Sequence, residues 1–170
     1  MANTYALINK NTLTSPASSF TFTSIPSTYT DLVVHVSARS NPESSYASNL
    51  LLTFNSDTAS NYSSISIQGP VDTNSTFTGS STNFNQIPGT LVGSNTFGSA
   101  EFYIFSYSSS TFKRIQSFSA VEINSSANYS IRNVEHLWSN SAAISSITIE
   151  AGTGSMIIGS SFYLYGVKNT

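Results

Sequence analysis

The side chains able to do acid–base or metal chemistry are few and widely spaced in this chain. Its 170 residues include eight acids, two histidines and no cysteine. The acids form no D-x-D or E-x-x-E arrangement, so the sequence does not place the carboxylate pair that a glycosidase uses. The absence of cysteine excludes disulfides, zinc–cysteine sites and thiol catalysis. We therefore predict a non-enzymatic protein with no catalytic residue and no cofactor.

Each candidate for a metal or nucleophile site also has a structural interpretation. His35 and His136 lie in strand-like segments without further ligands at metal-site spacing, which favours partly buried or interface histidines. Serine is abundant, but a G-x-S-x-G nucleophile elbow is absent. Asn55-Ser56-Asp57 lacks the spaced acids and the glycine of a calcium loop, so a simple turn is favoured. The sequence predicts no metal site.

Charge is low and evenly spread. Charged residues make up 8% of the chain and the net charge is −2. The six basic residues are Lys10, Arg39, Lys113, Arg114, Arg132 and Lys168. They are too few and too scattered to form a basic face, so neither a nucleic-acid nor an anionic-membrane partner is expected. The first ten residues, MANTYALINK, do not resemble a signal peptide, and we expect a chain made in the cytoplasm with no transmembrane segment.

Apolar and hydroxyl residues alternate with a period of two along most of the chain, which indicates β-strands. Weak strands are expected at 76–79 and 90–93, and a short helix over 42–48 is an alternative for one polar loop. The clearer strands are expected at 4–9, 19–24, 30–38, 49–54, 62–69, 100–107, 112–123, 129–138, 144–150 and 161–167. The spacing predicts an all-β fold: one β-sandwich domain over residues 1–170, of about 8–10 strands and without a linker, most simply a jelly roll.

Aromatic residues are the strongest candidates for contacts between subunits. In AEFYIFSY (100–107), alternation places Phe102 and Ile104 on one face and Tyr103, Phe105 and Tyr107 on the other, so both faces are expected to be covered. The predicted interface anchors are Phe105, Tyr107, Trp138 and Tyr165. Exposed Trp or Tyr rings that stack on sugars are the alternative role for such residues.

Several segments resemble small structural proteins of tailed bacteriophages. The similar segments are ANTYALINK at 2–10, FTSIPSTYTDLVV at 22–34, VSARS at 36–40 and SFYLYGVKN at 161–169. The resemblance spans nearly the whole chain, is strongest at its two ends, and does not extend to residues 70–99. It implies a role on a phage particle and carries over no catalytic residue.

Within that class, a capsid decoration (cement) protein is the expected function. Such proteins are often small β-sandwiches that trimerise and bind the major capsid protein at symmetry axes, so the resemblance implies a homotrimer on the capsid surface of the virion. The low charge is suited to dense packing against identical neighbours. The absence of cysteine is suited to assembly in a reducing cytosol. The alternatives are a tail-associated receptor-binding (adhesin) knob and a carbohydrate-binding module. The polar region 70–99 and the two termini are the expected contact segments.

Overall fold

The chain folds into strands joined by turns and loops. The computed structural model describes residues 4–69, 73–122 and 130–168. Within these ranges it contains twelve strands and no helix. The strands are β1 (Tyr5–Thr12), β2 (Ser19–Phe22), β3 (Asp31–Ala38), β4 (Ala47–Phe54), β5 (Tyr62–Gly69), β6 (Thr73–Gly79), β7 (Gln86–Pro88), β8 (Gly98–Ile104), β9 (Lys113–Val121), β10 (Ser130–Trp138), β11 (Ile147–Ala151) and β12 (Ser161–Val167).

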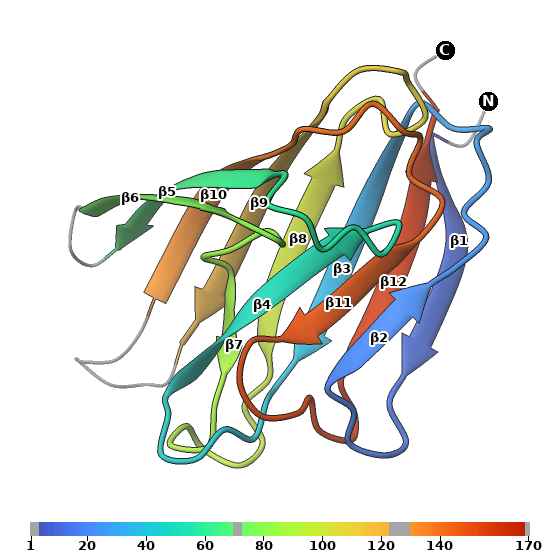
Figure 1. Ribbon diagram of the computed structural model, residues 1–170. Coiled ribbons are helices and arrows are strands. Elements are labelled where there is room, and N and C mark those ends of the chain that lie inside the picture. Colours follow the sequence, from blue (N-terminus) through green and yellow to red (C-terminus); the bar gives the residue numbers. More distant parts are fainter. Residues whose placement is uncertain (1–3, 70–72, 123–129, 169–170) are drawn as a thin grey trace.

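The strands form two antiparallel sheets that face each other as a β-sandwich (Figure 1). The larger sheet has the order β1-β12-β3-β8-β9-β10-β5-β6 and the smaller one β2-β11-β4-β7. The chain crosses between the sheets at most connections. The exceptions include the hairpins β5–β6 and β9–β10, which stay in the larger sheet and extend it. We call the four strands β9, β10, β5 and β6 the wing; in Figure 1 its β5–β6 hairpin projects at the left.

The predicted all-β sandwich is confirmed, whereas two local predictions are wrong. Residues 42–48 are not helical: Ser44 has a left-handed φ of 48° and Ser45 Oγ accepts the amide of Ala47, so a turn leads directly into β4. The segment 90–93 is a turn, and the strand of this region is β7 instead. The strand count exceeds the predicted 8–10. Tyr129 and Ile123, predicted to lie at strand ends, fall outside the described residues.

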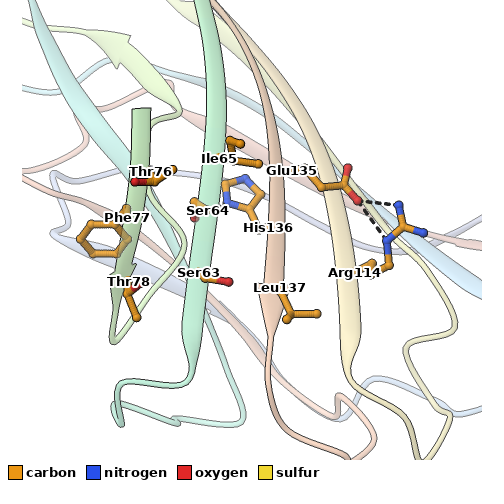
Figure 2. Close-up of a pocket in the computed structure, with 10 residues that line it drawn as sticks. All are labelled: Ser63, Ser64, Ile65, Thr76, Phe77, Thr78, Arg114, Glu135, His136 and Leu137. Atoms are coloured by element: carbon orange, nitrogen blue, oxygen red, sulfur yellow. Dashed lines mark hydrogen bonds and ion pairs between the residues drawn. The ribbon is translucent and has the colours of Figure 1, made fainter. Parts of the chain in front are cut away.

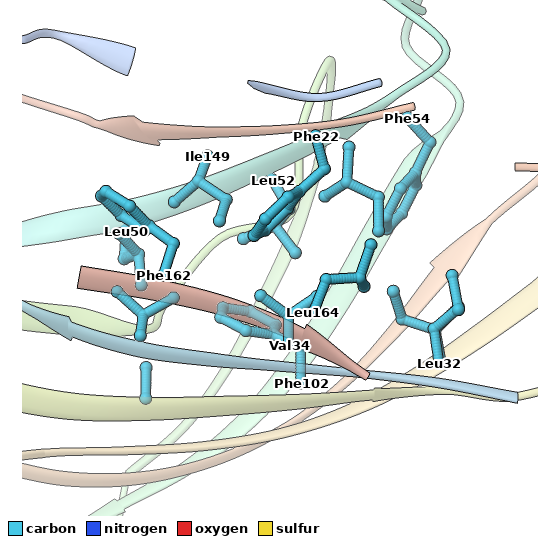
Figure 3. Close-up of a cluster of buried hydrophobic side chains, with 14 of the residues drawn as sticks. Phe22, Leu32, Val34, Leu50, Leu52, Phe54, Phe102, Ile149, Phe162 and Leu164 are labelled. Carbon is cyan, nitrogen blue, oxygen red and sulfur yellow. The ribbon is translucent and has the colours of Figure 1, made fainter. Parts of the chain in front are cut away.

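The space between the sheets is filled by aliphatic and aromatic side chains from the inward positions of both (Figure 3). Phe22, Phe54, Phe102 and Phe162 are each at most 1% exposed. The half-buried Phe20 stacks on Phe162 at 5.0 Å between ring centroids. Burial of this apolar surface is the main force that holds the two layers together.

Helical membrane spans are absent from the described part of the chain. None of residues 4–69, 73–122 and 130–168 belongs to a helix long and apolar enough to cross a bilayer.

Candidate interaction surface

The inner side of the wing buries polar side chains among its apolar ones. His136 on β10 is 2% exposed and lies between two serines: its Nδ1 is 2.7 Å from Ser64 Oγ on β5 and its Nε2 is 2.7 Å from Ser117 Oγ on β9. Ser117 also donates to Asn85 Oδ1 at 2.9 Å. The segment just before β7 therefore covers this side of the wing through hydrogen bonds.

The hydrogen-bond pattern assigns the proton on the His136 ring. The single hydroxyl proton of Ser117 is used on Asn85, so Ser117 accepts from Nε2–H, and Nδ1 accepts from Ser64. Burial lowers the pKa of His136 to about 3, because a charged imidazolium would lose its hydration there. His136 is a neutral structural histidine at physiological pH.

The outer side of the same strands is apolar. By the paired registers, Ile65 and Ile67 of β5, Phe118 of β9 and Ile131 of β10 lie on one face around Asn133. Their exposed fractions are 53%, 63%, 48% and 54%, respectively. We call Ile65, Ile67, Phe118 and Ile131 the apolar patch. Exposed large apolar side chains that gather on one face in this way indicate a candidate interaction site.

Two open depressions, of about 370 and 300 Å³, lie on the outer side of the wing. Ile65 and Glu135 line both. Glu135 accepts two hydrogen bonds from the Arg114 guanidinium, at 3.1 Å from Nε and 2.7 Å from Nη2, and Figure 2 shows this pair beside Ile65. Both side chains are well exposed, so the pair contributes little to folding stability. It does neutralise the rim of the apolar patch.

The outer face continues across β8, β3 and β12. His35 Nδ1 lies 3.4 Å from Glu101 Oε2, and the His35 ring makes an edge contact with Tyr165 at 5.6 Å. Tyr163 and Phe118 help to line a depression of about 340 Å³ beside them. The contact between His35 and Glu101 is an ion pair only when the imidazole is protonated.

Two of the four predicted interface anchors are core residues. Trp138 is fully buried because it occupies an inward position of β10, where it packs 5.4 Å from Phe54 and 6.3 Å from Tyr62. Tyr107 is fully buried because β8 ends at Ile104 and Ser106 adopts a left-handed φ of 47°, which turns the chain inward. Neither side chain reaches the surface of the folded chain.

The other two anchors lie at the surface. Phe105 is 37% exposed, and its ring lies 4.7 Å from that of Tyr103 and 5.7 Å from the Arg114 guanidinium. Tyr165 is half-buried, opposite Val33 in the register of the outer face. Both positions are available to a partner.

Asp57 serves a turn, as the sequence indicated. Its carboxylate accepts from Asn61 Nδ2, Trp138 Nε1 and Asn140 Nδ2 through Oδ2, and from the Ala59 amide through Oδ1. These hydrogen bonds, led by that from Asn61, lower its pKa to about 2. Four nitrogen donors occupy the oxygens that a calcium ion would need.

The polar loop between β7 and β8 is wrapped around Arg39. This side chain is 6% exposed, and its guanidinium donates to the carbonyls of Gly93 at 2.6 Å and Val92 at 2.9 Å. Longer hydrogen bonds reach Thr96 and Thr90, at 3.4 and 3.5 Å. Since an arginine fork can satisfy several carbonyls at once, one residue fixes the loop.

Metal-ligand clusters are not found in the described ranges: no group of three or more His, Cys, Asp or Glu is placed to hold an ion there. The chain matches no known protein family and no curated protein. The apolar patch is the surface feature on which we base the functional argument, and sequence reasoning did not single it out. The alternation SSISIQ in β5 was its signal, but alternation alone does not tell which side faces inward.

Proposed function

We propose that this chain is a non-enzymatic structural subunit of a tailed-bacteriophage virion, and within that class a capsid decoration protein. It binds as a homotrimer to the major capsid protein on the outside of the head. The proposal joins the sequence resemblance to one structural observation: the larger sheet exposes a broad, nearly neutral outer face with an apolar patch. A face of this composition is suited to packing against protein.

We further propose that the sandwich is a jelly roll with two insertions. Without the hairpins β5–β6 and β9–β10, the sheets have the orders β1-β12-β3-β8 and β2-β11-β4-β7. The chain then crosses between two four-stranded sheets at every connection except β4–β7, in the way that two Greek keys wind into a jelly roll. Jelly rolls are frequent in viral capsid proteins, which supports the proposal at the level of fold analogy.

Head binding tests the proposed function. Purified chain is mixed with mature, expanded heads of its own phage and with unexpanded proheads, and bound protein is measured after sedimentation. We expect saturable binding to expanded heads, at a stoichiometry set by the capsid lattice. Failure to bind those heads would remove the decoration assignment.

A tail-associated receptor-binding knob is the second candidate, favoured by the half-buried Tyr163 and Tyr165 beside His35 on the outer face. Tyrosine rings flanked by polar groups can stack on sugars. Trp138 cannot serve this role because it is fully buried, so Trp138→Ala does not discriminate sugar binding. Calorimetry with host-surface glycans, repeated on Tyr163→Ala, is the informative comparison; binding that this variant loses would favour the knob.

A further inference from the structure

We infer that the apolar patch, Ile65, Ile67, Phe118 and Ile131, is the contact that holds a second copy of this chain. This inference rests on the proposed function only in treating the chain as an assembly subunit. Its argument comes from the wing, where some positions are inverted relative to an ordinary half-buried sheet, with serines buried and large apolar residues exposed.

The inversion is plain in β5 and β9. In β5, Ser64 and Ser66 are 5% and 0% exposed, while Ile65 and Ile67 between and beyond them are more than half exposed. In β9, Ser117 is 3% exposed, whereas Phe118 next to it is 48% exposed. A sheet that gains stability by burying one face normally places its large apolar residues there.

The inner side of the wing buries apolar residues, Tyr62, Ile115, Val121, Val134 and Trp138, but it also buries polar groups among them. Within the described residues, three buried side-chain atoms have no hydrogen-bond partner: Ser66 Oγ, Asn85 Nδ2 and Arg132 Nε. Ser66 and Arg132 belong to the wing, and Asn85 to the segment that covers it. Burying polar atoms without partners costs free energy. Covering the outer side of the wing with another surface would therefore add apolar burial that the isolated chain lacks.

Charge on the outer face selects a neutral partner. Its exposed acids, Glu135 and Glu101, are balanced by Arg114, which pairs with Glu135, and by Lys10 on β1, which lies opposite Tyr163 in the register. A strongly acidic or basic partner would meet no net countercharge on this face. A second copy brings the same balanced face and requires no countercharge.

The size of the face is also that of a stable interface. The larger sheet has eight strands of seven to nine residues. With strands ~4.8 Å apart and ~3.3 Å per residue, the face covers about 900 Å². A standard protein–protein interface buries about 800 Å² on each partner. The apolar patch lies on three adjacent strands toward the β6 edge of this face, with polar residues around it.

Sedimentation velocity of the full chain tests the inference. Wild-type protein is expected to form a discrete oligomer at micromolar concentration, and Ile67→Asp to weaken it by about 10- to 100-fold in dissociation constant. Ile67→Thr, which keeps β-branching, is expected to weaken it in the same direction should the aspartate variant fail to fold. Ile158→Asp is the matched control, since Ile158 is 58% exposed but lies outside the wing.

The outcomes separate this inference from the proposed function. A monomeric wild type, or equal weakening by Ile158→Asp and Ile67→Asp, would overturn the inference. A trimer or a dimer that depends on Ile67 supports it. An oligomer that depends on the patch but binds no phage head would remove only the decoration function. A monomer that binds heads would remove only the inference about the apolar patch.

Discussion

Lowering the pH below 6.5 is expected to destabilise the fold through His136. In the unfolded chain this imidazole takes up a proton near its ordinary pKa of 6.5, whereas burial holds the native pKa at about 3. The unfolded state thus binds the proton more tightly throughout this window. The stability that the neutral ring provides is complete above pH 6.5 and decreases as the pH falls toward 3.

The size of the effect follows from proton linkage. Uptake of one proton on unfolding changes the free energy of unfolding by about 1.4 kcal/mol per pH unit, which gives a loss of about 2.5 kcal/mol between pH 7 and pH 4.5. His136→Gln removes the titrating group. Because glutamine cannot bridge Ser64 and Ser117 in the same geometry, this variant is also expected to lose about 1–2 kcal/mol at pH 7.

Urea unfolding at several pH values measures both effects, at one fixed protein concentration because subunit association shifts apparent stability. Between pH 6.5 and 4.5, the slope of the free energy of unfolding against pH is expected to decrease by the equivalent of about one proton in His136→Gln. In His35→Gln the wild-type slope is expected to persist. His35 is exposed and serves as the control. A slope unchanged in His136→Gln, or lost in His35→Gln, would refute the reasoning.

Three further substitutions test the packing around the sandwich. Arg39→Met leaves the carbonyls of the β7–β8 loop without their guanidinium donor and is expected to cost about 3 kcal/mol in urea unfolding. Trp138→Phe keeps a buried ring but removes the 2.9 Å indole hydrogen bond, with an expected thermal-melt loss of about 1 kcal/mol; no change would argue against that bond. Gly166→Ala would place a Cβ 2.3 Å from the Tyr29 ring and is expected to destabilise by about 1–3 kcal/mol. Gly69→Ala, with nothing within 4 Å of the new Cβ, is its control and should be close to neutral in the same melt.

Alternation in the sequence predicted most strands, because a period of two survives wherever one face is buried. The strands at 62–69 and 161–167 have the predicted bounds. The strand β7 was missed because it is three residues long and follows a polar stretch without alternation. The turn at 90–93 was mistaken for a strand because its two adjacent apolar residues, Leu91 and Val92, suggested one. The loop is shaped instead by hydrogen bonds from Arg39, which is distant in sequence.

The interaction surface was harder to predict than the fold. Alternation divides β5 and β10 into two faces but does not say which of them faces the other sheet. Trp138 was expected at an interface because large aromatics favour such places, yet its inward register sends it to the core. Ile67 is the opposite case: its type suggests burial and its register exposes it. The pairing of β10 with β9 and β5 decides which residues share a face, and packing against the smaller sheet, as of Trp138 on Phe54, decides which face is buried.

Immunogold labelling of intact particles of the proposed source phage, with antibody against this chain, tests the proposed location most directly. Gold spread over the head is the result that a capsid decoration protein predicts. Gold confined to the tail or its tip would contradict that account, and Tyr163 and Tyr165 on the outer face would then be the residues to substitute in receptor-binding assays.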